Sequence, residues 1–153
     1  MATGAEMEKH SCKTYFVVYF NFDREKNAAL LRERFDCLPE EIGIFNKEEV
    51  EKFIIEAFGV HPQWDRHCFI IGYNEMYNVN VNEMLRITLK DLFGKEDKIK
   101  ELCKKFGVTV MLEIVPYIVG DSEEPCQILS LERDIIEFLY DSGAEMDIDY
   151  YVL

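Results

Sequence analysis

The sequence lacks most of the features that would assign it to a specialised class of protein. Only 4 of its 153 residues are proline and 8 are glycine, and no segment is rich in Pro, Gly or Ser, so no linker or low-complexity tract is expected. No apolar run approaches the roughly 20 residues of a membrane helix. The stretch Met1–Lys13 also lacks the apolar core of a signal peptide. These absences predict one domain over residues 1–153, with residues 1–13 as a flexible tail.

Cysteine is the next scarce feature. The five cysteines are odd in number, widely scattered and form no CxxC pair: they are Cys12, Cys37, Cys68, Cys103 and Cys126. This pattern matches neither a disulfide framework nor a zinc ribbon. Reduced thiols are typical of the cytosol, so a cytoplasmic location is predicted.

Positive charge is scarce as well, and its distribution is uneven. The net charge is −13, from 17 basic and 30 acidic residues. The segment Val108–Leu153 has a local net charge of −10, whereas Tyr77–Gly107 has a net charge of +2. A negative field repels nucleic acid and disfavours anionic membrane surfaces, but it attracts cationic proteins. The simpler alternative is that the charge only keeps the domain soluble.

What the chain does contain is ample material for a core, since 48% of its residues are hydrophobic. Runs of β-branched and aromatic residues, or strict alternation, predict four strands: Thr14–Phe22, His67–Asn74, Val108–Val119 and Met146–Val152. Helical periodicity with cap and stop residues predicts the helices: Asp23–Asp36, Asn46–Phe58, Asn82–Phe106 with either a kink or a division into two short helices at Gly94, and Ser130–Ser142. Loops are expected at Cys37–Gly43 and Gly120–Gln127, and a turn at Val60–Trp64.

The pattern favours an α+β fold over a parallel doubly wound sheet. In Met146–Val152, apolar residues alternate with Asp147 and Asp149, which suits a strand with one exposed face. No glycine-rich turn joins a strand to a helix, as a nucleotide-binding parallel fold would require. We therefore predict a two-layer sandwich: a mostly antiparallel or mixed sheet of four to five strands with helices on one face.

Few residues suggest chemistry. In the segment HPQWDRHC, the residues His61, Asp65, His67 and Cys68 invite a metal site. Neighbouring residues on a strand point to opposite faces, however, so His67 and Cys68 cannot converge on one ion. No cysteine or serine has a recognisable catalytic partner. No metal, cofactor or catalytic residue is therefore predicted.

The C-terminal part resembles a known bacterial family. The resemblance rests on Trp64, on the segment IKELCKKFGVTVMLEIVPYI (Ile99–Ile118) and on the segment EPCQILSLERDIIEFLYDSGAEMDIDYYVL (Glu124–Leu153). The closing phrase GAEMDIDYYVL, a helix stop followed by an acidic alternating strand, is the most specific part. Over Trp64–Leu153 the sequence resembles domain of unknown function 4279. The resemblance implies a compact α+β domain of bacterial cytosolic origin, and it implies no catalytic residue.

The leading hypothesis is a non-enzymatic protein that binds a basic partner, for example an immunity protein that neutralises a cationic toxin. Carboxylates on a rigid sheet and loop can occupy the positions where a nuclease expects phosphate. The expected contacts are Asp121, Glu123, Glu124, Asp147 and Asp149.

Two alternatives remain. One is an enzyme or small-ligand binder with a pocket lined by Trp64, Tyr73 and Glu113. The other is a homo-oligomeric structural module that associates through an exposed strand edge.

Overall fold

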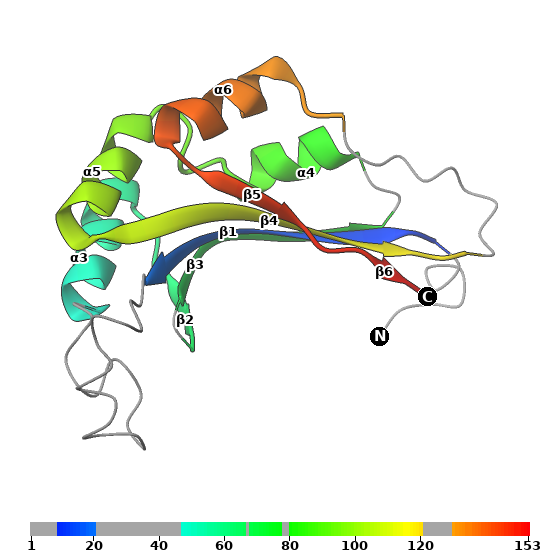
Figure 1. The fold of residues 1–153 in the computed structure, drawn as a ribbon, viewed down its shortest axis with the longest axis horizontal. Helices are drawn as coiled ribbons and strands as arrows, with labels where there is room; N and C mark the ends of the chain where they lie inside the picture. The colour runs from blue at the N-terminus through cyan, green and yellow to red at the C-terminus, as the bar shows by residue number, and fades with distance from the viewer. Residues whose placement is uncertain (1–8, 21–46, 67, 78–79, 121–129) are drawn as a thin grey trace, which may run out of the picture.

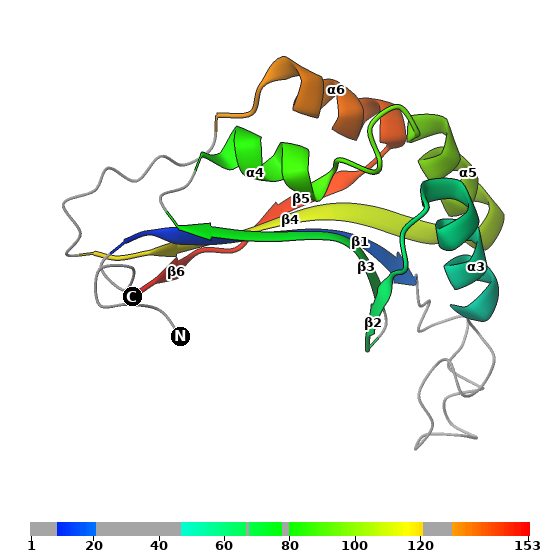
Figure 2. The same ribbon diagram turned by 180° about the vertical axis from the view of Figure 1, so that it is seen from behind.

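The computed structural model describes residues 9–20, 47–66, 68–77, 80–120 and 130–153, which form one sheet with helices on one side (Figures 1 and 2). The strands are β1 (Ser11–Phe20), β2 (Gln63–Asp65), β3 (Cys68–Tyr77), β4 (Val108–Ile118), β5 (Glu145–Ile148) and β6 (Tyr151–Val152). The described helices are α3 (Lys47–Phe58), α4 (Val81–Thr88), α5 (Glu96–Phe106) and α6 (Arg133–Ser142). The expected α+β fold is confirmed.

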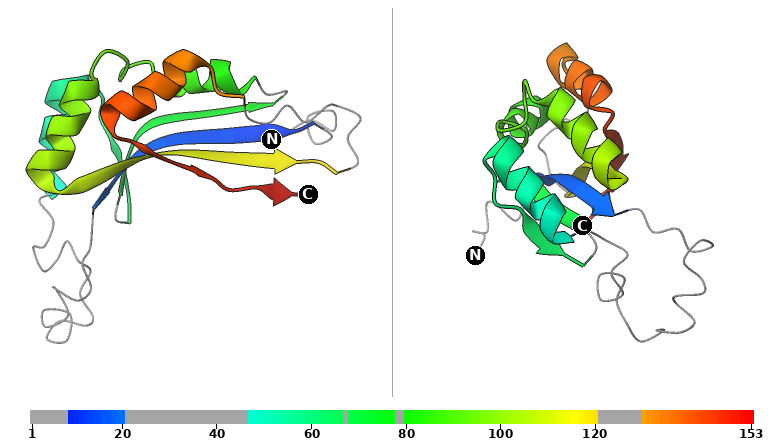
Figure 3. Two further views of the ribbon diagram at one scale, coloured as in Figure 1. Left: turned by 45° about the horizontal axis from the view of Figure 1, so that its top comes forward. Right: turned by 90° about the vertical axis from the view of Figure 1, so that its left-hand side faces the viewer.

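The sheet is mixed, and β1 lies near its centre. The strand order is β2-β3-β1-β4-β5, and β6 also pairs with β4 (Figure 3). The pairs β2–β3, β3–β1 and β1–β4 are antiparallel, whereas β5 and β6 both run parallel to β4. Most neighbouring strands are thus antiparallel, as the sequence predicted.

The core lies between the sheet and the helices. Alternate residues of β1 and β4 are buried against the helices, among them Phe16, Val18, Leu112 and Ile114. The helices contribute fully buried side chains to the same cluster: Ile54, Met84, Leu85, Ile99, Leu102 and Ile135. Each such side chain stabilises the fold by about 1.5–3 kcal/mol relative to an exposed one. This apolar layer therefore supplies most of the stability.

Helix α4 approaches β3 unusually closely at Gly72. A Cβ atom on Gly72 would lie 2.3 Å from the backbone oxygen of Thr88, the last residue of α4. The same crossing contains a buried polar contact, because the hydroxyls of Thr14 and Thr88 are 2.5 Å apart. Thr88 also donates to the carbonyl oxygen of Met84 at 3.0 Å. Gly72 thus allows the helix to lie directly on the strand.

The observed helix ends agree with those predicted from the sequence in some places and differ in others. Gly59 and Gly143 have φ of 69° and 72°, the left-handed conformation expected of their helix stops. The helical run around Gly94 divides into two helices, α4 and α5, the second of the two alternatives that the glycine left open. Asn80, rather than Asn82, caps α4 by accepting from the Glu83 amide at 3.2 Å. The helix expected at Asp23–Asp36 and the loop at Cys37–Gly43 lie outside the described residues.

Two local predictions are wrong. Ser130 does not cap α6, which starts at Arg133 with Glu132 in the cap position. The Asn82 side chain holds this start instead: it donates to the Ser130 carbonyl at 2.6 Å and accepts from the Glu132 amide at 2.8 Å. The expected turn before β3 contains a short strand, β2, because its backbone pairs with β3. Long-range contacts override the local signal in both cases.

The last strand is in the sheet as predicted, but in two pieces. β5 and β6 share one register on β4, with Ile148 beside Ile114 and Tyr151 beside Tyr117. Between them, the Asp149 amide donates to the Ile114 carbonyl at 3.0 Å. The alternation therefore continues through the break, so Asp147, Asp149 and Tyr151 share one face. Among the described helices, none has the length and apolarity needed to span a membrane.

Candidate functional site

One side of the sheet faces away from the described helices (Figure 1). Strand register places most of the tyrosines on this side. Residues on this side alternate with the buried ones along each strand. Six of the eight tyrosines of the chain lie here: Tyr15, Tyr19, Tyr73, Tyr77, Tyr117 and Tyr151. We call this surface the tyrosine face. Three of its members remain widely exposed: Tyr73 at 49%, Tyr151 at 46% and Tyr77 at 38%.

Strand register arranges the tyrosine face in rows. One row crosses four strands and contains Tyr73, Tyr15, Glu113 and Asp147 side by side. The rings of Tyr15 and Tyr73 are 5.0 Å apart. In a second contact, the rings of Tyr117 and Tyr151 stack at 5.3 Å with an interplanar angle of 17°. The aromatic rings therefore form contacts across strands on a sheet whose backbone holds them in place.

Three tyrosine hydroxyls of this face donate hydrogen bonds to carboxylates. Tyr73 donates to Glu75 at 2.9 Å, Tyr151 donates to Asp149 at 3.0 Å, and Tyr19 donates to Glu113. Burial and the Glu75 hydrogen bond raise the pKa of Tyr73 to about 12. Burial and the Glu113 hydrogen bond likewise raise the pKa of Tyr19 well above its ordinary value. These hydroxyls therefore stay protonated at neutral pH and hold the carboxylates in fixed orientations.

The tyrosine face is strongly negative. Its carboxylates come from β3, β4 and the β5–β6 segment: Glu75, Glu113, Glu145, Asp147 and Asp149. Within the described strands, Lys13 is the only cationic residue. It lies opposite Glu75, and its Nζ is 5.3 Å from the centre of the Tyr117 ring. Glu113 and Asp147 are like charges at directly neighbouring positions of β4 and β5, an arrangement that destabilises a sheet.

The structure separates the residues that the sequence analysis grouped. Asp147 and Asp149 lie on the tyrosine face, whereas Asp121, Glu123 and Glu124 lie outside the described residues. Tyr73 and Glu113 are on the tyrosine face. Trp64 is on the helix side, packed on Phe69 at 4.9 Å with Lys47 over its ring at 4.4 Å. The three residues of the alternative pocket therefore do not line one cavity.

The described thiols have the properties of core residues. Cys12 and Cys68 are buried, and Cys103 is half-buried. Burial raises the pKa of Cys12 and of Cys68 to about 11, the opposite of the shift that activates a nucleophile. In the described part of the chain, no three His, Cys, Asp or Glu side chains gather as metal ligands would. His67 is outside that part.

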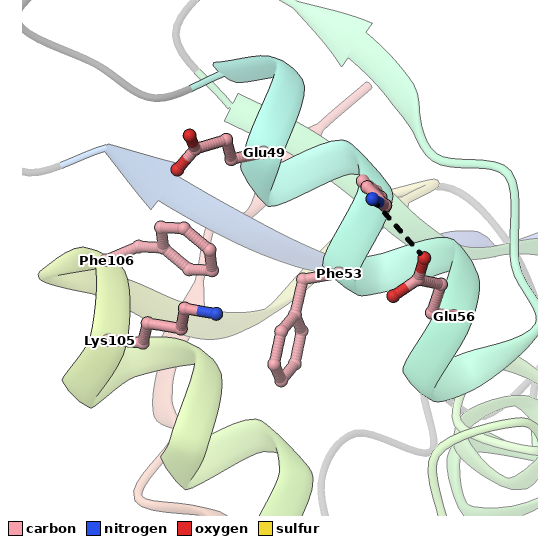
Figure 4. Close-up of a pocket in the computed structure, with 6 residues that line it drawn as sticks. Glu49, Phe53, Glu56, Lys105 and Phe106 are labelled. Atoms are coloured by element: carbon pink, nitrogen blue, oxygen red, sulfur yellow. Dashed lines mark ion pairs between the residues drawn. The ribbon is translucent and has the colours of Figure 1, made fainter.

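A hollow lies between α3 and α5 (Figure 4), at one end of the sheet (Figure 1). Its volume is about 330 Å³. Phe53 of α3 and Phe106 of α5 meet edge to face at 5.9 Å, and Lys105 lies over both rings. Lys52 and Glu56 form an exposed ion pair of 3.9 Å on its rim. The lining is a mixture of two rings and opposite charges, so it selects no single ligand chemistry.

Comparison with protein families identifies the family of the chain. The model of the family described as "Domain of unknown function (DUF4279)" matches residues 52–153, about two thirds of the sequence. The chain belongs to this family. The match starts ahead of Trp64 and confirms the resemblance inferred from the C-terminal part. Searches among curated proteins and among solved structures found no significant match.

The DUF4279 match covers most of the tyrosine face, including β3 to β6, but not β1. Sequence reasoning found Asp147 and Asp149 on this face and named Tyr73 and Glu113 for an alternative pocket, but it did not group the six tyrosines on one surface. One local signal was present: in both Tyr73–Glu75 and Asp149–Tyr151, a tyrosine and a carboxylate stand two residues apart on a strand. Such spacing places both side chains on one face.

Proposed function

We propose that this DUF4279 protein is a non-enzymatic binding protein that docks a basic protein on its tyrosine face. The observation that carries the proposal is the composition of that face: five carboxylates and six tyrosines against the single cation Lys13, among the described residues of the strands and the β5–β6 segment. Tyrosine is enriched at protein interfaces because it combines a large apolar surface with a hydrogen-bonding hydroxyl. The sign of the charge selects a cationic partner.

Two further features support a recognition role. Glu113 and Asp147 keep like charges side by side, which reduces stability and therefore favours a role outside the free protein. The exposed fractions of Tyr73 and Tyr151 are near one half, so both rings retain surface that a partner can bury. An immunity protein that covers the active site of a cationic toxin is one protein of this kind. Asp121, Glu123 and Glu124 are proposed as additional contacts.

The proposal also covers the compartment. Cys12, Cys68 and Cys103 are all free thiols, as expected for a reducing environment. We therefore propose a cytoplasmic location. We also propose that nucleic acid and anionic membranes are not partners, because the negative field of the protein repels them.

The test compares the parent protein with a variant in which Glu75, Glu113, Asp147 and Asp149 are replaced by their amides. Partners are captured from the native host, identified and purified, and association rates are measured from about 0.05 to 1 M salt. The captured partner should be basic. Its association with the variant should be several-fold slower at low salt, and the difference should vanish as the Debye length shortens from about 10 Å at 0.1 M to about 3 Å at 1 M.

A matched control variant replaces Glu48, Glu56, Glu101 and Glu137 by glutamine, which removes the same number of charges from the helices. This control should associate nearly as fast as the parent, because its charges lie away from the tyrosine face. An acidic partner, or equal slowing of both variants, would refute docking on this face.

A further inference from the structure

The tyrosine face contains the same small unit twice. In the first, Tyr73 donates to Glu75 at 2.9 Å, and in the second, Tyr151 donates to Asp149 at 3.0 Å. Each unit therefore presents a half-exposed tyrosine ring beside a carboxylate, and the hydroxyl of the same tyrosine holds that carboxylate in place. A ligand group that fits one unit needs a flat surface for the ring and hydrogen-bond donors for the free carboxylate lone pairs.

The protein already holds one of its own cations on this face. Lys13 projects between the two units, with its Nζ 5.3 Å from the Tyr117 ring centre. It lies opposite Glu75 on β3 and Val115 on β4, and Tyr117 stacks in turn on Tyr151. A cation over a ring with a carboxylate nearby is thus a contact that this surface forms internally. The flanking carboxylates exceed this single charge, so the face retains capacity for further cations.

Arginine fits these units better than lysine does. A guanidinium group is planar, so it can stack on a tyrosine ring while the donors on its edge reach a carboxylate. An ammonium group is a compact, strongly hydrated point charge that cannot make both contacts with the same geometry. The carboxylates of the two units, Glu75 and Asp149, lie in one row three strand spacings apart, or about 14 Å at roughly 4.8 Å per spacing. The rings of Tyr73 and Tyr151 are also offset by four positions along the strands, so they are about 20 Å apart. Two arginines five to six residues apart in an extended segment span about the same distance.

We infer that the tyrosine face recognises arginine side chains of its partner, one guanidinium stacking on Tyr73 beside Glu75 and a second on Tyr151 beside Asp149. This inference rests on the proposed docking of a basic protein and specifies which basic side chain is read. A neutral sugar could also stack on the rings, but it would leave the excess of five carboxylates over Lys13 without counter-charge, so the charge of the face favours a cationic protein segment.

The experiment measures binding of hexa-arginine and hexa-lysine peptides, which have equal charge, to the full chain by titration calorimetry at about 0.05 M salt. Maltohexaose is the neutral probe. Each stacked guanidinium should improve affinity about two- to fivefold over lysine, so hexa-arginine should bind about 4- to 25-fold more tightly. The double variant Y73L/Y151L should lose this preference while it retains weak, salt-sensitive binding of both peptides. Maltohexaose should not bind.

Y73F/Y151F keeps the rings and removes the hydroxyls, so it should retain most of the arginine preference and confirm that the rings provide it. Y140L is the matched control, since Tyr140 on α6 is 84% exposed and lies away from the face.

Equal affinity for the two peptides in the parent would overturn the arginine inference and leave docking of a basic protein standing. Binding of maltohexaose that disappears in Y73L/Y151L would overturn it in favour of a sugar. If the parent binds neither peptide, and if its association with the native partner does not depend on salt, then the proposed docking of a basic protein is refuted as well.

Discussion

The two faces of the sheet are made from alternate residues of the same strands, yet their chemistry is opposite. On β4, Leu112 and Ile114 are fully buried against the helices, whereas Glu113 between them lies on the tyrosine face. On β1, Phe16 is buried and Tyr15 contacts Tyr73. The comparison shows how one stretch of chain separates two tasks: the residues of one face provide stability, and those of the other are free to serve recognition.

The largest expected effect is a difference in the free energy of unfolding between two variants of β4, Leu112→Ala and Met111→Ala. Leu112 is 0% exposed in the core cluster, and its truncation should lower the free energy of unfolding by about 2–5 kcal/mol. Met111 lies on the opposite face and is half-buried, so its truncation should cost less than half as much. Urea denaturation followed by circular dichroism measures both. Equal losses would mean that the tyrosine face is as important to stability as the core.

The next effect concerns the crossing of α4 over β3. Gly72→Ala should destabilise the protein by about 1–3 kcal/mol, because the new methyl group meets the Thr88 backbone oxygen, which cannot move without shifting the helix. Gly120→Ala serves as the control, since its Cβ would meet only the Leu153 backbone oxygen at 3.8 Å. Thermal unfolding should separate the two variants by several degrees. A Gly72→Ala protein as stable as the parent would disprove the close packing.

A smaller effect of opposite sign is expected on the tyrosine face. Asp147→Asn removes a like charge beside Glu113, so it should stabilise the free protein by about 0.2–1 kcal/mol at low salt. High salt should reduce this gain. The same substitution should slow partner association, so stability and binding should change in opposite directions. If Asp147→Asn instead destabilises the protein, then the acidic row contributes to the fold rather than to recognition.

The smallest expected effect is a pH dependence. The pKa of Tyr73 is raised to about 12 in the folded protein, by burial and by its bond to Glu75, whereas an unfolded tyrosine titrates near 10. The folded state therefore holds this proton more tightly. The resulting stabilisation is fully present below about pH 10 and is lost as the pH rises toward 12. Urea midpoints from pH 8 to 11.5 should fall for the parent and fall less steeply for Tyr73→Phe, and parallel curves would contradict this assignment.

The sequence predicted one side of this comparison much better than the other. Alternation in Val108–Ile118 and in the closing acidic strand correctly placed both segments in the sheet and Asp147 and Asp149 on one face. The tyrosine face escaped prediction because its members come from strands that are far apart in the sequence: Tyr15 and Tyr73 are 58 positions apart, and Tyr117 and Tyr151 are 34 positions apart. Only register brings Tyr15 beside Tyr73 and Tyr117 beside Tyr151.

Local signals failed for a related reason at α6 and β2. Ser130 has the residue type of a helix cap, but Asn82 from α4 supplies the hydrogen bonds at that helix start. Trp64 follows a proline in a segment typical of turns, yet pairing with β3 draws it into the sheet. In both places, a partner distant in sequence determines the structure, and such partners leave no trace in local composition.

The central position of β1 has a consequence for synthesis of the protein. β1 is the first described strand along the chain, yet its partners on β4 follow about a hundred positions later. A ribosome adds about 5–20 residues per second, so β1 waits about 5–20 s for this partner. During that interval, the segment TYFVVYF presents an apolar, β-prone strand with unpaired backbone on at least one edge. Slower translation or lower chaperone capacity should therefore increase the aggregated fraction of newly made chains, even though the finished sheet buries this strand between two neighbours.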